Sequence, residues 1–354
     1  MLKSIRKQFM LAVTAVTLAL VPLSAQAEAK DSFKVCWSIY VGWMPWGYIQ
    51  DSGIMKKWAD KYDIDVEIVQ INDYIESINQ YTAGAFDGCT MTNMDALTIP
   101  SVGGVDTTAL IVGDFSNGND GIVLKQGDAV ADLKGREVNL VELSVSHYLL
   151  ARALESVGLA ERDLTVVNTS DADIVAAFAS RTDKAAVVTW NPQLSEVAAL
   201  PGAAKIFDSA DIPGEIIDLM VVNTETLADN PKLGKALVGA WYEMMGLMHE
   251  DADIRAKLGK AAGTDLAGYD AQLATTRMFY APAEAVSFTE SADLVATMDA
   301  VRKFSDAHGL LGESGQSVDA VGIAFPGGKT LGDTANIRLR FDPAFMAQAA
   351  SGGL

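Results

Sequence analysis

The sequence predicts an α/β protein with two lobes, in which each lobe is a mostly parallel sheet flanked by helices. Three observations support this fold class. Apolar runs of strand length alternate with segments of helical periodicity along most of the chain. Two polar stretches, residues 113–121 and 208–218, interrupt this alternation, as expected where a chain crosses between lobes. About 327 residues follow the leader described below, which is enough for two domains.

The first lobe opens with successive strand-helix-strand units. Ile54, Trp58 and Tyr62 recur at helical spacing, and Asp73 caps a helix that Gly84 terminates. Such β-α-β steps imply a parallel, right-handed sheet. The strands of this lobe are predicted at residues 34–38, 64–71, 86–91 and 107–112.

The second lobe repeats the pattern after the first crossing. Its helices are expected to begin at Ser144 or Ser146, at Ser170 and at Asn191-Pro192. Its strands are expected at residues 138–141, 164–168 and 185–190. A strand at 219–223 then returns to the first lobe, and Asn230-Pro231 begins a long helix. The predicted lobes are therefore residues 28–115 with 219–354, and residues 116–218. The tail from Gly327 is glycine-rich and then strand-like at 337–341.

The first 27 residues are predicted to be a signal peptide outside the fold. Lys3, Arg6 and Lys7 precede an apolar segment at 9–23, and Ala25-Gln26-Ala27 is a small-x-small cleavage site. No later stretch reaches the roughly 20 apolar residues that a spanning helix needs. No cysteine follows the cleavage site directly, which argues against a lipid anchor. We therefore expect an exported, soluble, periplasmic protein.

Charge and cysteine content limit the possible partners. The net charge is -19, and about -22 once the three cations of the leader are removed, which argues against nucleic acid or an anionic membrane as partner. Solubility alone would also account for this charge. The two cysteines, Cys36 and Cys89, fall on strands expected to be neighbours, so they either form a disulfide or remain buried thiols. No metal-ligand spacing occurs among the cysteines and histidines, so neither metal nor cofactor is expected.

Residues 35–51 contain three of the six tryptophans. An apolar strand here leads into a segment rich in glycine and proline, interpreted as a loop at the carboxyl end of the strand, where α/β domains bind ligands. Tyr40, Trp43 and Trp46 are candidate ligand-binding residues, because aromatic faces are apolar and also attract cations. Core packing is the alternative, and it is preferred for Trp37 inside the strand.

Three motifs are spread over residues 33–248: Asp51-Ser-Gly-Ile-Met-Lys-Lys-Trp before Ile64-Asp-Val-Glu-Ile, then Tyr81-Thr-Ala-Gly-Ala-Phe-Asp-Gly, and Ser144-Val-Ser-His-Tyr-Leu-Leu-Ala-Arg-Ala-Leu followed by Gly158-Leu. Together they resemble the type II periplasmic substrate-binding proteins of ABC transporters, most closely the nitrate/sulfonate/taurine-type family. The resemblance implies two lobes that close on a small solute and deliver it to a membrane permease. The Trp43-Met-Pro-Trp segment further resembles the branch encoded near urea carboxylases, whose implied ligand is urea or guanidine.

The predicted cleft loops contain acids but no cations. Helix N-termini favour anions, and a nitrate or sulfonate binder should add Lys or Arg to them. Neither residue type occurs in residues 62–124, 138–151, 188–204 or 206–231, which include acids such as Asp95, Asp114, Asp120, Glu142, Glu215 and Asp218. Guanidinium fits such a cleft, because its N–H groups pair with carboxylates and its face stacks on indole. Urea is the alternative. It needs a hydrogen-bond donor for its carbonyl, and because it is neutral, a carboxylate buried beside it would be unfavourable unless other groups bonded it.

The remaining candidate residues lie at the ends of predicted strands. Glu142 is the preferred carboxylate, although a solvated loop acid is the alternative, and Asp218 could equally be a hinge residue. Trp190 could close an aromatic cage or pack in the core. His147, one residue inside a helix, is a weaker candidate. The polar candidates are Thr92, Asn93, Asp95, Glu142, Ser144 and Asp218, of which those after the third strand could simply cap a helix.

Other functional classes receive less support. The chain lacks a Gly-x-Ser-x-Gly elbow, a His-Glu-x-x-His pair and a phosphate-binding Gly-x-x-x-x-Gly-Lys, so an enzyme is not expected. A sensor that binds the same solute is a second alternative, and the sequence does not separate it from a transport component. We expect a monomer that acts with a permease.

Overall fold

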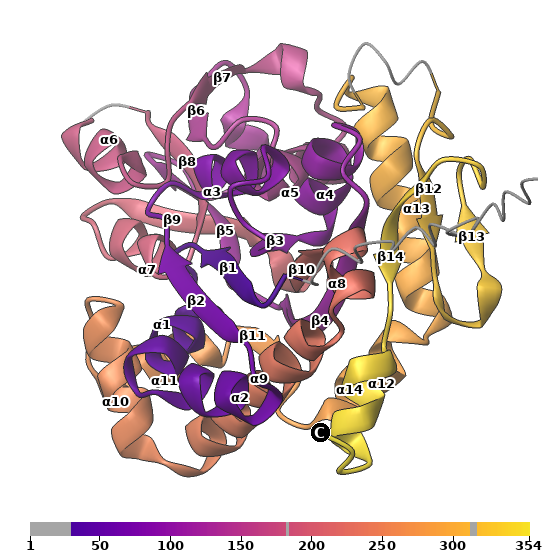
Figure 1. The fold of residues 1–354 in the computed structure, drawn as a ribbon. Helices are drawn as coiled ribbons and strands as arrows, with labels where there is room; N and C mark the ends of the chain where they lie inside the picture. Colours follow the sequence, from indigo (N-terminus) through magenta and orange to yellow (C-terminus); the bar gives the residue numbers. More distant parts are fainter. Residues whose placement is uncertain (1–29, 182–183, 312–316) are drawn as a thin grey trace, which may run out of the picture.

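The structure is a computed structural model that describes residues 30–181, 184–311 and 317–354. The predicted signal peptide, residues 1–27, lies outside the described residues. The fold is α/β, with two sheets flanked by helices (Figure 1), which confirms the predicted fold class. No helix within these ranges has the length and apolar character needed to cross a membrane.

The larger sheet has nine strands within the described residues, in the order β13-β12-β14-β4-β10-β3-β1-β2, with β11 paired to β4. β1 pairs in parallel with β2 and β3, as predicted. β10 runs antiparallel between β3 and β4. The strands are β1 (Ser32–Trp37), β2 (Asp65–Gln70), β3 (Gly88–Thr92), β4 (Thr107–Ser116), β10 (Ile217–Asn223), β11 (Thr276–Met278), β12 (Gly322–Ala324), β13 (Thr330–Leu331) and β14 (Ile337–Phe341).

The smaller sheet has five described strands in the order β7-β6-β8-β5-β9. β6 pairs in parallel with β7 and β8, whereas β5 runs antiparallel to β8 and β9. These strands are contiguous in the sequence: β5 (Asp120–Lys125), β6 (Glu137–Leu140), β7 (Thr165–Asn168), β8 (Ala186–Trp190) and β9 (Ala203–Asp208).

Helices cover both sheets, and one hydrophobic core cluster includes residues of both. α1, α2 and α9 pack against one another beside the larger sheet (Figure 1). The helices are α1 (Met44–Asp51), α2 (Ile54–Tyr62), α3 (Tyr74–Thr82), α4 (Asn93–Ala96), α5 (Val145–Ser156), α6 (Ile174–Ser180), α7 (Gln193–Ala198), α8 (Thr224–Asp229), α9 (Lys232–Glu250), α10 (Ala252–Ala261), α11 (Leu266–Leu273), α12 (Pro282–Thr289), α13 (Ala292–Ala307) and α14 (Ala344–Ala350).

Local capping signals explain several helix starts. The side chain of Asp73 accepts a hydrogen bond from Glu76 N at 2.9 Å, and Gly84 follows α3 with a φ of 80°, as predicted. Ser144 caps α5 by accepting from Ser146 N. Asn230 likewise accepts from Lys232 N at the start of α9.

The segment interpreted as an aromatic loop is largely helical. After a short connection, α1 begins at Met44 and contains Trp46 and Tyr48. Pro45 lies in the first turn, where its fixed φ and missing N–H group favour helix initiation. The loop interpretation was therefore wrong from Met44 onward, because proline next to glycine was taken as a loop signal.

The first predicted crossing is shorter than expected. β4 continues to Ser116 and β5 begins at Asp120, so only residues 117–119 connect them. Glycine at position 113 serves close packing, since a Cβ there would lie 3.2 Å from Trp241 Cζ2. β5 and β9 were not predicted, and α6 begins at Ile174 rather than at Ser170.

The disulfide alternative for the two cysteines is the one observed. Cys36 on β1 is paired in register with Cys89 on β3, and the two form a disulfide. The tail also joins the core, because β14 extends the larger sheet with Leu339 opposite Thr107.

Candidate functional site

A buried cavity lies where the two sheets meet. The space left among its lining side chains is small, about 10 Å³, which is close to the volume that one water molecule needs. Thr92 and Asp218 come from the larger sheet, whereas Asp120 and Trp190 come from the smaller one. Side chains of both sheets therefore line this cavity, and a solute of several heavy atoms requires its two sides to move apart. Its lining consists of Tyr40, Trp43, Tyr74, Thr92, Asp120, Val145, Trp190, Ile216 and Asp218, all of them buried.

Four aromatic rings form a continuous wall of this cavity. The Tyr40 and Trp43 ring centroids are 5.0 Å apart in an edge-to-face arrangement. Trp43 and Tyr74 are 5.8 Å apart, and Tyr74 and Trp190 are 5.5 Å apart. Trp190 Nε1 donates to the carbonyl of Ile39 at 3.1 Å, which joins the two sides of the wall. The rings supply flat apolar faces that attract cations.

Two carboxylates line the cavity and a third lies behind it. Asp218 stands at the start of β10, opposite Asp114 of β4 in the antiparallel register. Tyr40 donates from its hydroxyl to Asp114 Oδ1 at 2.9 Å. Asp114 Oδ2 and Asp218 Oδ2 are buried without a hydrogen-bond partner among the described residues. Such atoms are rare in folded proteins and mark a place where a donor is expected.

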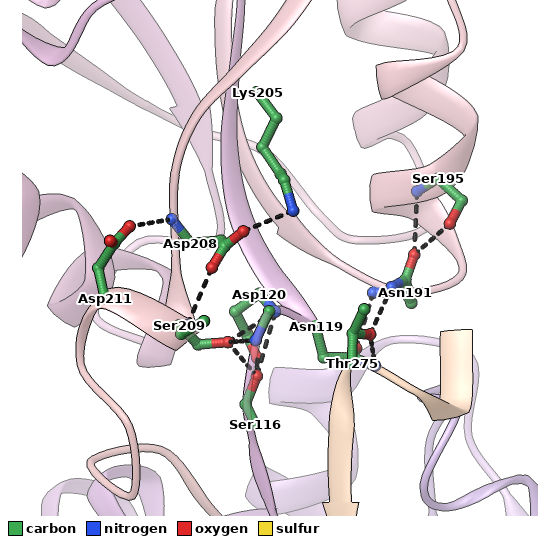
Figure 2. Close-up of polar contacts among 12 residues, drawn as sticks. Ser116, Asn119, Asp120, Asn191, Ser195, Lys205, Asp208, Ser209, Asp211 and Thr275 are labelled. Atoms are coloured by element: carbon green, nitrogen blue, oxygen red, sulfur yellow. Dashed lines mark hydrogen bonds and ion pairs between the residues drawn. The ribbon is translucent and has the colours of Figure 1, made fainter. Parts of the chain in front are cut away.

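Asp120 connects the cavity to both chain crossings. Its Oδ2 accepts from Ser116 Oγ at 2.5 Å, and Ser116 Oγ lies 2.6 Å from Ser209 Oγ (Figure 2). Ser116 precedes the first crossing and Ser209 belongs to the second. Asn119, next to Asp120, donates to Thr275 Oγ1 at 3.1 Å (Figure 2). Hydrogen bonds therefore connect Asp120 to both segments that join the two sheets.

A fourth buried acid, Asp95, holds the wall in position. Its Oδ2 accepts from the Tyr74 hydroxyl at 2.5 Å and from Thr92 Oγ1 at 2.8 Å. Thr92 N in turn donates to the Tyr74 oxygen at 3.0 Å. Asp95 does not line the cavity, and its contacts fix the orientation of a residue that does.

The electrostatics of this region favour positive charge. Burial raises the pKa of Asp120 to about 7 and that of Asp95 to about 6. Burial also raises the pKa of Asp114 and of Asp218, and for Asp218 the nearby Asp114 charge adds to the effect. The cavity lining contains no Lys, Arg or His among the described residues. A bound cation would relieve this accumulation of buried negative charge.

Five of the ten predicted ligand residues line this cavity: Tyr40, Trp43, Thr92, Trp190 and Asp218. Asp95 lies directly beneath it. The other four do not line it. Trp46 is stacked on Trp241 at a centroid distance of 4.9 Å and is 1% exposed, so it is a core residue and we exclude it from the candidate site.

Glu142, Ser144 and Asn93 have other environments. Glu142 is exposed and borders an open groove, so the preferred carboxylate of the sequence analysis is not in the cavity. The Ser144 hydroxyl donates to Val141 O at 2.7 Å and caps α5. Asn93 bonds the backbone of Glu215 and Ile217 and thereby anchors β10.

His147 also lies outside the cavity. Its Nδ1 accepts from Leu143 N, and its Nε2 lies 3.2 Å from Glu161 Oε1. Of these residues, Glu161 borders a larger, open hollow of about 700 Å³ between α5 and α13. The carboxylates that border this hollow have basic partners: Glu155 is paired with Arg152, and Glu161 with His147 and His308.

Sequence reasoning missed three residues of this region. Tyr74 begins a helix, so its position was explained by the cap at Asp73 alone. Asp114 and Asp120 fell in a stretch taken as a crossing and were noted only as acids of the cleft loops. Their strand positions on β4 and β5 place Asp120 in the lining and Asp114 behind it, and recognising those two strands would have identified them.

The raised pKa values predict how stability depends on pH. The pKa of Asp120 is 3.8 without burial and about 7 in the fold, so the folded protein binds more protons between these values. The free energy of unfolding of the ligand-free protein should therefore fall as pH rises from about 4 to about 7. The increase in the pKa of Asp120 on folding corresponds to a loss of at most roughly 4 kcal/mol in the free energy of unfolding over this pH range. Thermal midpoints between pH 4.5 and 8 measure it.

The Asp120→Asn variant separates this effect from the repulsion of the whole acidic surface. We expect its thermal midpoint to decline less steeply with pH than that of the wild type. Equal slopes in the two proteins would show that Asp120 ionises as freely in the fold as in the unfolded chain.

Comparisons with known proteins agree with the fold. A family model described as NMT1/THI5 like matches residues 53–253. A candidate binding protein of Brucella abortus is 26% identical over 179 residues, which cover 48% of this chain. The match spans 55% of that relative, so the chain covers only about half the length of the curated relatives it matches.

Solved structures resemble the chain over most of its length at low identity. The alkanesulfonate-binding protein SsuA of Xanthomonas axonopodis pv. citri has a TM-score of 0.66 and 18% identity, over 81% of this chain and 96% of that one. The nitrate-binding protein NrtA of Synechocystis has a TM-score of 0.59 and 13% identity, over 90% and 98%. The desulfurization enzyme DSZB, with a TM-score of 0.56 and 15% identity over 78% and 93%, shows that the fold also hosts catalysis.

Proposed function

The chain belongs to the NMT1/THI5-like family, whose model matches more than half of it, and from this premise we propose that it is the extracytoplasmic solute-binding component of an ABC importer. The proposed ligand is guanidinium, held in the cavity between the two sheets. The curated relative named as a binding protein and the structures named for sulfonate and nitrate binding support the coarser part of this proposal.

The choice of a cation rests on one observation: Asp218 lines the cavity with an unpartnered carboxylate oxygen, and the lining contains no basic side chain among the described residues. Guanidinium offers N–H donors in a plane that suits two carboxylates, here Asp218 and Asp120. Its faces would lie against the rings of Trp43 and Trp190. Urea offers similar donors but no charge, and it would leave the buried acids without a counter-charge.

An anion is the alternative that the structural relatives suggest. Alkanesulfonate and nitrate are named for two of them, but each is less than 25% identical to this chain. The four buried acids around the cavity, Asp95, Asp114, Asp120 and Asp218, oppose a bound anion, because like charges repel strongly in a buried site.

Closure of two lobes follows from the same proposal. We assign residues 28–115 and 219–354 to one lobe and residues 116–218 to the other. Hydrogen bonds join the two sides around the cavity, including Val41 N to Asn191 O at 3.2 Å and Ser170 Oγ to Asp73 Oδ2 at 2.7 Å. A solute can reach the cavity only when such contacts separate, so the described arrangement corresponds to the closed form.

The proposed location is the periplasm, reached through the predicted signal peptide. The disulfide between Cys36 and Cys89 is compatible with an oxidising compartment. The proposed partner is a membrane permease, with the protein acting as a monomer. A solute sensor is the second candidate, and a catalytic role has no support from the cavity, where the described lining offers no Ser-His or Cys-His pair.

The proposal is tested by calorimetric titration of the ligand-free protein, beginning at residue 28, with guanidinium chloride, urea and sodium nitrate. We expect guanidinium to bind with a micromolar or lower Kd, urea to bind at least tenfold more weakly, and nitrate not to bind. Sodium chloride at matched ionic strength is the control. Selective urea binding would refute the cation argument, and tight nitrate binding would restore the anion alternative.

A further inference from the structure

Two carboxyl groups at the cavity face each other without a cation between them. β4 and β10 place Asp114 opposite Asp218. Both are at most 3% exposed, and only Asp218 lines the cavity. Residues directly opposite each other on antiparallel strands have Cβ atoms about 4.5–5.5 Å apart, so the two carboxyl groups lie close together, and burial and the Asp114 charge raise the pKa of Asp218. Two ionised carboxylates only accept hydrogen bonds and repel each other when buried, so this proximity favours a proton on one of them.

Among the described residues, no positively charged side chain acts on this pair. The Tyr40 hydroxyl donates to Asp114 Oδ1, and Asp120 on β5 adds further negative charge. A Cβ on Gly42 would lie 2.9 Å from Asp114 Oδ2, so backbone closely covers that side of the pair. The other titratable groups that act electrostatically on Asp114 are the phenols of Tyr269 on α11 and Tyr280 after β11.

We infer that Asp114 and Asp218 share one proton in the ligand-free protein and release it to solvent when a cation binds in the cavity. This inference rests on the proposed binding of guanidinium. One positive charge enters the site and one leaves, so the net charge of the buried site is unchanged. Asp114 is then a specificity-determining residue behind the lining, because it sets how many negative charges a ligand meets.

The exchange of the shared proton for a bound cation allows the site to discriminate between cations and neutral molecules. Guanidinium displaces the proton and gains a second ionised carboxylate. Urea carries no charge, so it would leave the proton in place and meet a site with one negative charge fewer. At pH values below the one at which the pair loses its proton, the affinity for guanidinium should decrease as the pH decreases. The decrease is about tenfold per pH unit for each proton released on binding.

The test combines two measurements on the protein beginning at residue 28. Titration with guanidinium chloride at pH 8, where Asp120, with a pKa of about 7, is mostly ionised, gives the number of protons that the pair releases when buffers of different ionisation enthalpy are compared. We expect about one proton for the wild type, less than half of that for Asp114→Asn, and the wild-type value for Glu142→Gln, whose carboxyl is exposed. An infrared spectrum of the ligand-free protein reports the protonated carboxyl directly.

The infrared signal of a buried protonated carboxyl should be present in the wild type, reduced in Asp114→Asn and lost from the wild type when guanidinium is added. Guanidinium binding without proton release, or with equal release in Asp114→Asn, would overturn the inference while leaving the proposed function intact. Absence of guanidinium binding would overturn the proposed function. The ligand-free spectrum would still decide whether the pair holds a proton.

Discussion

The Asp218→Asn variant is expected to bind guanidinium at least about 100-fold more weakly than the wild type. Truncating one partner of a buried charge pair typically costs about 2–5 kcal/mol, and each 1.4 kcal/mol is about tenfold in affinity. Asparagine preserves the shape of the side chain but offers an amide in place of one carboxylate oxygen. The measurement is calorimetric titration at pH 7.5.

Two controls make this result specific. The thermal midpoint of ligand-free Asp218→Asn should equal or exceed that of the wild type, because the substitution removes a buried charge that faces Asp114. Glu142→Gln should change the affinity by less than twofold, since Glu142 is exposed outside the cavity. If Glu142→Gln weakened binding and Asp218→Asn did not, the ligand would lie in the open groove near Glu142.

The Trp46→Ala variant should lose about 3–5 kcal/mol of stability with little change in the ligand affinity of the folded protein. Trp46 and Trp241 are each 1% exposed and stacked, so truncation leaves a large cavity in the core. Heat should be used to unfold the protein, because guanidinium and urea are both candidate ligands and would stabilise the folded state by binding it.

Leu143→Ala is a suitable control for this prediction, because Leu143 is 50% exposed and its truncation should change stability by only about 0.5 kcal/mol. The opposite result for Trp46→Ala, with unchanged thermal stability and sharply weaker guanidinium binding, would return Trp46 to the ligand site.

The sequence allowed much of the fold to be predicted where local signals and burial agree. The caps at Asp73, Ser144 and Asn230 were predictable from residue type, because each side-chain oxygen accepts a hydrogen bond from a backbone N–H group at the start of a helix. β5 and β9 were missed because pairing with distant strands, which adjacent residues do not reveal, determines where they begin and end.

The candidate site was predictable where a strand ends in a distinctive side chain. Trp190, Thr92 and Asp218 all stand at strand ends, and all three line the cavity. Trp46 was misplaced because a tryptophan close to proline and glycine has the same local signature in a loop and in a helix start. Asp114 acquires its importance only from the strand opposite, on which Asp218 lies about 100 residues later.

The arrangement of strands along the chain has a consequence for how the protein is assembled. The smaller sheet is made from one continuous segment, Asp120 to Asp208, and contains every strand it needs once that segment is present. The larger sheet pairs Thr107 with Leu339, so it stays incomplete until nearly the whole chain is available. Pairings so far apart in sequence slow folding. The smaller sheet should therefore fold first and the cavity should form late, when β10 enters between β3 and β4.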